Sequence, residues 1–142
     1  MKTFGIIGAG RIGKLHAENL ITRVKGTKLK AVTDPFLDEK WAYSKGIPVT
    51  GKDHRTILDD KEIDAVLICS PSRQHAQQII ECAHFGKHIF CEKPIALDPE
   101  VIRNSLLEVE KAGIKLQVGF NRRFDPSFAS VREKVSSGAL GD

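Results

Sequence analysis

A glycine pattern directly after the first apolar segment constrains the fold of this chain most. Residues 4–7 have the composition of a buried strand, and the run Gly8-Ala9-Gly10-Arg11-Ile12-Gly13 then opens a segment of helical period. A G-x-G-x-x-G run between a strand and a helix is typical of a turn that binds the pyrophosphate of a dinucleotide. Gly8 permits the tight turn, Gly10 leaves room for the pyrophosphate, and Gly13 lets helix and strand pack closely.

The start of the helix after this turn can bind the negative charge of the pyrophosphate. Its first N–H groups, those of Arg11, Ile12 and Gly13, have no partner within the helix and can meet the phosphate charge. The alternative interpretation, a tight turn with incidental glycines, does not explain why the pattern sits at the end of the first strand. We therefore predict a dinucleotide cofactor.

The rest of the chain alternates short apolar runs with longer segments of helical period. This alternation predicts a Rossmann-type, doubly wound α/β fold, an open and mainly parallel sheet with helices on both faces. The candidate strands are residues 4–7, 29–32, 65–69, 88–91 and 116–118. The candidate helices are residues 11–22, 37–45, 74–85, 99–112 and 128–135. In helix 99–112 the expected apolar stripe is Val101, Ile102, Leu106, Leu107 and Val109.

Asp34 follows the second strand, about 20 residues after Gly13, where a carboxylate accepts hydrogen bonds from the adenosine ribose hydroxyls. A 2′-phosphate would meet a like charge there, and Pro35 and Phe36 offer no basic clamp, although Arg11 or Lys40 remains within conceivable reach. The sequence therefore favours NAD over NADP. A role for Asp34 as a helix cap alone remains open.

Two polar segments follow central strands, at the sheet edge where ligands bind in such folds. After residues 65–69 come Ser70 and Pro71, expected beside the nicotinamide and its ribose. His75 would lie in the first turn of the next helix, and either a cofactor contact or a capping and packing role fits it.

The second polar segment is Glu92-Lys93-Pro94, directly after strand 88–91. A lysine beside a cofactor can exchange a proton with a substrate hydroxyl or hold its oxygen. Pro94 would fix the direction of Lys93, and the peptide bond between them could be cis. A surface lysine in a turn is the competing interpretation.

The bulk properties exclude several classes of protein. The net charge is +4, but the Lys and Arg residues are scattered and no basic run interleaves with aromatic residues, which argues against nucleic-acid binding. No apolar run approaches the length of a membrane span. Three unpaired cysteines in apolar segments indicate buried thiols rather than a metal site or disulfides. Because the sequence shows neither a membrane span nor the basic and apolar regions of a signal peptide, we expect a cytoplasmic protein.

The combined motifs resemble the Gfo/Idh/MocA oxidoreductases, with the last one pointing to their inositol dehydrogenase branch. The resemblance runs the whole chain, and the segments that carry it are residues 8–16, 31–34, 90–96 and 119–125, the last of which reads Gly-Phe-Asn-Arg-Arg-Phe-Asp. It implies that Lys93 is an active-site residue, that Glu92 contacts the nicotinamide ribose, and that Arg122 lies near cofactor and polyol. The activity it implies is NAD-dependent oxidation of a ring hydroxyl of myo-inositol or a similar cyclic polyol to a ketone.

The resemblance also predicts the domain organisation. Residues 1–125 would form the NAD(P)-binding domain, and residues 126–142 a helix that begins the connection to an absent α/β domain. In the family that second domain binds substrate, supplies a catalytic Asp and His, and forms the homo-oligomer, so this chain alone would bind cofactor without turnover. Two alternatives remain: a related sugar dehydrogenase, and a dinucleotide-binding sensor without catalysis.

Overall fold

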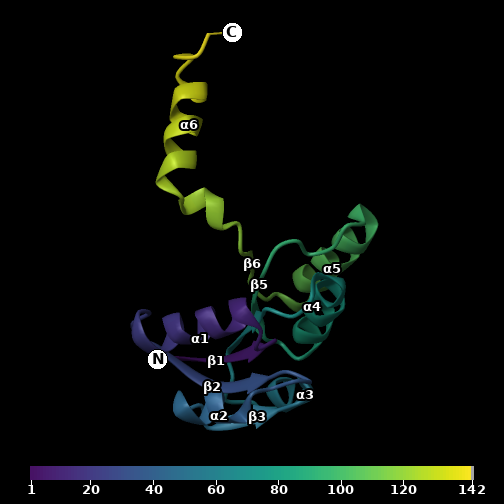
Figure 1. Ribbon diagram of the computed structural model, residues 1–142. Helices are drawn as coiled ribbons and strands as arrows, with labels where there is room; N and C mark the ends of the chain where they lie inside the picture. The colour runs from purple at the N-terminus through teal and green to yellow at the C-terminus, as the bar shows by residue number, and fades with distance from the viewer. Residues whose placement is uncertain (142) are drawn as a thin grey trace.

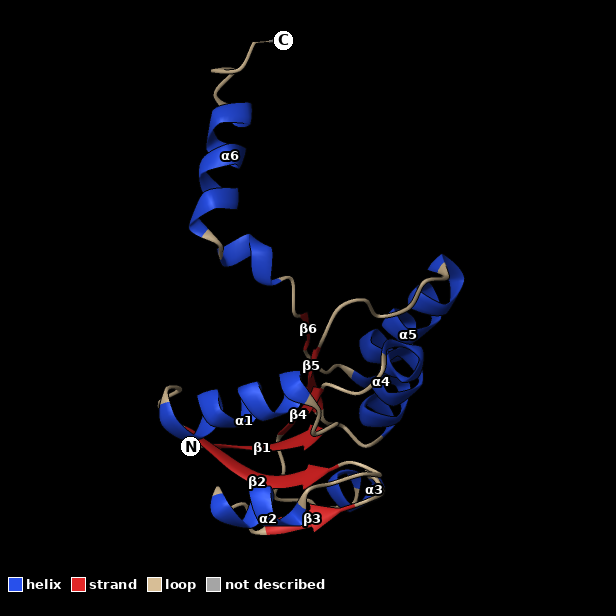
Figure 2. Cartoon of the chain, viewed as in Figure 1, coloured by secondary structure: helices blue, strands red, loops and turns tan. Residues whose placement is uncertain are grey.

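The computed structural model describes residues 1–141. Six strands form one parallel sheet in the order β3-β2-β1-β4-β5-β6, so the chain starts in the middle and winds outward in both directions (Figure 2). This is the strand order of a doubly wound dinucleotide-binding fold, and it confirms the predicted fold class. The strands are β1 (Lys2–Ile7), β2 (Thr27–Thr33), β3 (Val49–Gly51), β4 (Ala65–Ile68), β5 (His88–Cys91) and β6 (Leu116–Val118).

Helices connect the strands and cover the sheet in two groups (Figure 1). One buried cluster joins the sheet to α1 and α2 through Ala17, Leu20 and Ala42, and a second joins it to α3, α4 and α5 through Ile57, Ile79 and Val109. The helices are α1 (Arg11–Thr22), α2 (Glu39–Ser44), α3 (Arg55–Leu58), α4 (His75–His84), α5 (Pro99–Ala112) and α6 (Pro126–Ser136). Two short 3-10 helices, η1 (Ser72–Gln74) and η2 (Asn121–Phe124), complete the list.

The ends of α5 follow from its sequence. Asp98 caps the start by accepting a hydrogen bond from the backbone N–H of Glu100, and Pro99 occupies the first position, where no N–H is needed. Gly113 ends the helix at φ +64°, the left-handed turn that glycine adopts without strain. These signals explain why residues 99–112 matched the sequence prediction.

The buried face of α5 differs from the predicted stripe. Ser105 and Val109 are buried and Ile102 is half-buried, whereas Leu106 and Leu107 are each 44% exposed and Val101 is exposed as well. The i, i+3, i+7 row of Ile102, Ser105 and Val109 faces the domain, so the prediction was wrong for the three exposed residues.

Two elements had no counterpart in the sequence prediction. Strand β3 has only three residues and pairs with β2 at the sheet edge, and α3 has four. Strand β3 (Val49–Gly51) has a single apolar side chain, whereas the equally short β6 has two, so no apolar run marks β3; the four residues of α3 span only about one helical turn. They nevertheless extend the sheet beyond β2 and place Lys52 and His54 beside the carboxyl edge.

The three cysteines are free thiols within or beside the core. Burial raises the pKa of Cys69, Cys82 and Cys91 to about 12, so each thiol is protonated and unreactive at neutral pH. The expectation of buried, reduced cysteines is confirmed for Cys82 and Cys91, while Cys69 is partly exposed at the end of β4. Among residues 1–141 no helix is long and apolar enough to cross a membrane.

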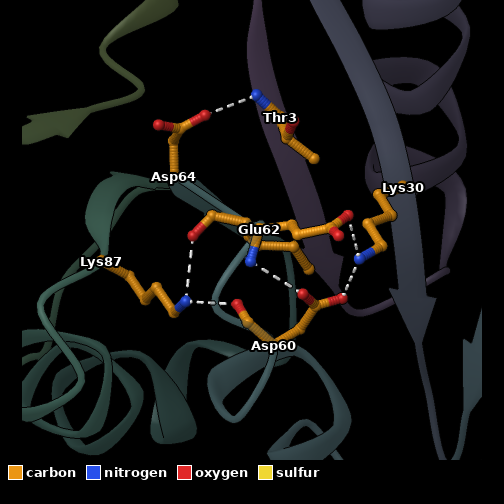
Figure 3. Close-up of polar contacts among 7 residues, drawn as sticks. Thr3, Lys30, Asp60, Glu62, Asp64 and Lys87 are labelled. Carbon is orange, nitrogen blue, oxygen red and sulfur yellow. Dashed lines mark hydrogen bonds and ion pairs between the residues drawn. The ribbon is translucent and has the colours of Figure 1, made fainter.

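Figure 3 shows a polar cluster formed by Thr3, Lys30, Asp60, Glu62, Asp64 and Lys87. Thr3, Asp64 and Lys87 lie at the amino ends of β1, β4 and β5, the opposite ends of these strands from the glycine turn. The buried Lys87 ammonium donates to the carbonyl oxygens of Asp60 and Ile63 at 2.6 and 2.9 Å. Burial lowers the pKa of Lys87, and the nearby Asp60 carboxylate partly opposes that effect. Lys30 lies 2.6 Å from Asp60, and their side chains are 18% and 19% exposed.

We expect this cluster to contribute to acid stability. The hydrogen bond from Lys30 holds the pKa of Asp60 below its usual value of 3.8, so its stabilising effect is present above that pH and is lost as the pH falls through the folded-state pKa. Asp60→Asn should therefore lower the melting temperature at neutral pH, and its difference from wild type should shrink below about pH 4.

Melting temperatures measured by circular dichroism between neutral and acidic pH test this expectation. Asp59→Asn is the matched control, because Asp59 is the exposed neighbour of Asp60. A difference between Asp60→Asn and wild type that stays constant across the pH range would contradict the proposed role of the ion pair.

Helix α6 projects away from the sheet at the carboxyl end of the chain (Figure 1). Every residue from 126 to 141 is exposed, and its N-cap Asp125 accepts from the backbone N–H groups of Ser127 and Phe128. The sequence predicted this helix at residues 128–135; in the structure it begins two residues earlier and ends one residue later. The division into residues 1–125 and 126–142 stays a prediction, and Asp142 lies outside the described residues.

Candidate cofactor site

The glycine turn packs three elements against one another. Gly8 has φ +96°, and a Cβ there would lie 2.6 Å from the backbone carbon of Cys69 and the nitrogen of Ser70. A Cβ at Gly13 would lie 1.9 Å from the carbonyl oxygen of Gly8. Both distances are far below van der Waals contact, so β1, β4 and the first turn of α1 meet only because these residues are glycines.

Gly10 differs from its two neighbours in the motif. A Cβ there would meet nothing within 4 Å, so the space above Gly10 is open. Among the described residues, no side chain caps α1 and no acidic residue lies in its first turn. The exposed Arg11 and half-buried Ile12 begin the helix. This open, uncapped helix start can receive an anion with its N–H groups, which is the arrangement that a pyrophosphate requires.

Asp34 ties the end of β2 to this turn. One carboxylate oxygen accepts from the backbone N–H of Ala9 at 2.7 Å, and the other accepts from that of Phe36 at 2.8 Å. The N-cap of α2 is Asp38, whose side chain accepts from the N–H of Trp41, so Asp34 does not serve as that helix cap. Each Asp34 oxygen keeps a lone pair for a further donor.

A pocket of about 290 Å³ opens beside Asp34 at the carboxyl edge. Its lining brings together four of the residues predicted for the cofactor: Gly8, Asp34, Ser70 and Pro71. Its size and its position between the ends of β2 and β4 suit the adenosine half of a dinucleotide.

The same pocket contains residues that sequence reasoning missed. Gln78 of α4 accepts a hydrogen bond from the Ser70 hydroxyl at 2.5 Å, which fixes that side chain. The hydroxyl of Thr33, 1% exposed, is the buried side-chain group without a hydrogen-bond partner among the described residues. Lys52 and Arg73 also line the pocket. Apart from polarity inside a strand or helix, no signal in the sequence marked these residues.

A second pocket of about 420 Å³ shares Ser70 with the first and continues along the sheet edge past α1. Its lining includes Arg11, Ile12, Glu92 and Lys93. The Lys93–Pro94 peptide bond is cis, as the sequence had suggested. Lys93 is exposed, so only a bound molecule or a further segment of the protein could bury its ammonium group. We call the two pockets together the trough, because they share Ser70 and both touch the glycine turn, the first through Gly8 and the second through Arg11 and Ile12.

His75 lies in the wall of the second pocket and is almost fully buried there. Its side chain is 1% exposed, and its two ring nitrogens lie 2.7 Å from the Pro94 carbonyl oxygen and 2.8 Å from that of Ser70. Both ring nitrogens face backbone carbonyl oxygens of the wall, and a protonated nitrogen donates to the carbonyl that it faces, so the polar atoms of the ring are directed into the protein. Of the two interpretations that the sequence left open, the structure supports packing: His75 holds the Ser70 and Pro94 segments together.

Arg122 is placed away from Lys93. Its guanidinium lies 4.5 Å from the ring centroid of Phe128, and it lines a surface pocket between η2 and α6. Asn121, its neighbour, lines the trough instead. The structure thus does not bring Arg122 to the predicted cofactor and substrate residues, because the chain turns at η2 toward α6. The described residues contain no group of three metal-binding side chains.

Comparison with known sequence families decides the classification. A sequence profile described as "Oxidoreductase family, NAD-binding Rossmann fold" (GFO_IDH_MocA) matches residues 2–120. The chain belongs to the Gfo/Idh/MocA oxidoreductases. Its cofactor is accordingly NAD, which agrees with the open glycine turn and with the carboxylate of Asp34.

Known members of the Gfo/Idh/MocA family resemble the chain closely. An uncharacterised oxidoreductase of Bacillus subtilis is 48% identical and the scyllo-inositol 2-dehydrogenase (NAD(+)) of the same organism is 41% identical, each over 96% of this chain. The crystal structure of scyllo-inositol dehydrogenase from Lactobacillus casei with bound NAD(H) and scyllo-inositol superposes with a TM-score of 0.91 at 39% identity and covers 100% of this chain.

The similarity covers only part of these relatives. The chain spans 40% of the length of both Bacillus subtilis proteins and 43% of the Lactobacillus casei structure. The relation to this oxidoreductase family therefore concerns the NAD-binding domain, and the activity of the whole protein is a matter for proposal.

Proposed function

We propose that the whole protein oxidises a ring hydroxyl of myo-inositol or a similar cyclic polyol to a ketone, with NAD as its oxidant. The observation that carries this proposal is that Lys93 lines the same pocket as Arg11 and Ile12 of the glycine turn. The printed names of the relatives support the substrate class, since several of them are inositol dehydrogenases.

The cofactor half of the proposal assigns roles along the trough. Gly8, Gly10 and Gly13 shape the turn, and the N–H groups of Arg11 and Ile12 bind the pyrophosphate. When bound, NAD supplies a hydride acceptor. The proposed contacts are Asp34 with the adenosine ribose, Ser70, which lines both pockets, with the nicotinamide side, and Glu92 with the nicotinamide ribose. Pro71 was predicted at the nicotinamide side as well, but it lines only the pocket beside Asp34, so we propose that it contacts the adenosine side.

The substrate half of the proposal depends on Lys93. Its ammonium would donate a hydrogen bond to the reacting hydroxyl oxygen, orient it, and take part in moving the hydroxyl proton. The long side chain of Lys93 is exposed and free to adjust to the position of the substrate. Closure of the site would remove water from around its ammonium group. Arg122 is proposed as a second substrate contact, and to reach a polyol in the trough its guanidinium would have to leave the Phe128 ring.

We further propose that the whole protein continues beyond residue 142 with a domain that closes the trough. That domain would supply an Asp and a His as the general base and would form the homo-oligomer, while the chain described above would bind NAD without turnover. The free thiols suit a reducing compartment, and we propose the cytoplasm.

NADH formation by the whole protein with a panel of polyols tests this function. Myo-inositol and scyllo-inositol should give a kcat/KM at least about tenfold above that of glucose, because a hydroxyl-binding pocket discriminates strongly between polyols. Higher turnover of glucose would indicate a related sugar dehydrogenase instead. NAD binding without NADH formation from any polyol would indicate a dinucleotide-binding protein without catalysis.

A further inference from the structure

His16, on the second turn of α1, contacts Glu92 at the end of β5. The Nε2 atom of His16 lies 2.9 Å from Oε1 of Glu92, and the two side chains are 23% and 22% exposed. A carboxylate can only accept a hydrogen bond, so Nε2 is the nitrogen that donates. The contact links the helix that begins at the glycine turn to the residue next to Lys93.

The imidazole of His16 is held from a second side by Phe90. The two ring centroids are 5.2 Å apart at an interplanar angle of 65°, an edge-to-face arrangement. Phe90 lies on β5, two residues before Glu92. The aromatic contact therefore fixes the plane of the imidazole in which Nε2 points at the carboxylate.

Gly119 leaves room for the same carboxylate. A Cβ at residue 119 would lie 3.1 Å from Oε1 of Glu92 and 3.0 Å from Cζ of Phe90, tighter than ordinary contacts. The backbone N–H of Lys93 lies 3.3 Å from Oε2. Three segments of the chain thus confine one carboxylate, although it remains partly exposed to the trough.

We infer that His16 is a positioning residue for the cofactor. By donating to Oε1, it turns Oε2 of Glu92 toward the trough, where that oxygen accepts hydrogen bonds from the nicotinamide ribose hydroxyls. The inference rests on the proposed function, because the ribose contact of Glu92 is part of it. It assigns to His16 a role that acts through Glu92, without contact to the reacting atoms.

The test compares two variants of His16 with one of Glu92. His16→Phe keeps an aromatic ring against Phe90 and removes the N–H donor, whereas His16→Gln places an amide N–H near the position of Nε2. The ligands are NAD and ADP, which lacks the nicotinamide ribose. Calorimetric titration of the chain gives both affinities, and ADP binding also reports whether each variant is folded.

His16→Phe and Glu92→Ala should each weaken NAD binding about tenfold and leave ADP binding unchanged, as expected for one lost charge-assisted hydrogen bond. His16→Gln should restore most of the NAD affinity. The double variant His16→Phe/Glu92→Ala should bind NAD no more weakly than Glu92→Ala alone, because the histidine acts through the carboxylate.

The possible failures are distinguishable. If Glu92→Ala leaves NAD binding unchanged, the ribose contact in the proposed function is wrong and the inference falls with it. If Glu92→Ala weakens NAD binding and His16→Phe does not, the ribose contact stands and the positioning role is overturned. Equal losses of NAD and ADP affinity in His16→Phe, without rescue by His16→Gln, would reduce His16 to a packing residue.

Discussion

Replacing Gly13 by alanine is expected to destabilise the domain by about 3 kcal/mol or more, a large part of the stability of a chain this size. Helix propensity alone favours alanine by about 1 kcal/mol. The steric effect has the opposite sign and is larger, because the new Cβ would lie 1.9 Å from the Gly8 carbonyl oxygen. Helix α1 can avoid this overlap only by moving off the sheet and giving up the packing of Ala17 and Leu20.

Gly10→Ala is the matched control within the same motif. Gly10 has φ −68° and ψ −171°, which alanine adopts freely, and a Cβ there would meet nothing within 4 Å. Its free energy of unfolding should change by less than about 1 kcal/mol, while NAD affinity falls because the methyl group occupies the pyrophosphate space. Urea unfolding of both variants measures the difference. Equal stability losses would contradict the distinction between packing and ligand-facing glycines.

Replacing Lys93 by alanine should lower the kcat of the whole protein by about a hundredfold or more, the usual contribution of a group that handles a proton in the reaction. The fold should be unaffected, because Lys93 is exposed. NAD affinity should change little, since the proposed pyrophosphate and ribose contacts involve other residues. Steady-state kinetics with myo-inositol, together with an NAD titration, measure both quantities.

Lys61→Ala is the control for this experiment. Lys61 is also an exposed lysine, but it lies in the turn before β4, at the amino end of that strand. Its removal should leave kcat unchanged. Turnover by Lys93→Ala equal to that of wild type would sink the assignment of Lys93 as the residue that holds the substrate hydroxyl.

The sequence was sufficient for the elements whose signals are local. The pattern of Gly8, Gly10 and Gly13 predicted the turn between β1 and α1, and Asp98 with Gly113 marked both ends of α5. Apolar runs located five of the strands, because a parallel strand covered on both faces has nearly all its residues buried. Strand β3 was missed, because Val49 is its only apolar residue, whereas the equally short edge strand β6 has the apolar Leu116 and Val118.

The site was predictable where a residue's place in the chain also determines its place in space. Ser70, Glu92 and Lys93 come directly after strands, so their position at the carboxyl edge followed from the fold. The pairing of His16 with Glu92 did not, because it depends on how α1 lies across β5. The family resemblance placed Arg122 near cofactor and polyol, whereas its guanidinium packs on Phe128 in this structure.

The central claim is that this chain binds NAD along the trough and selects it through Asp34. Calorimetric titration of the chain with NAD and with NADP tests that claim most directly. We expect one NAD per chain, bound at least about tenfold more tightly than NADP, because the 2′-phosphate would meet the Asp34 carboxylate. Equal affinities would contradict the claim and would indicate that Lys52 and Arg73, which line the same pocket, clamp the extra phosphate.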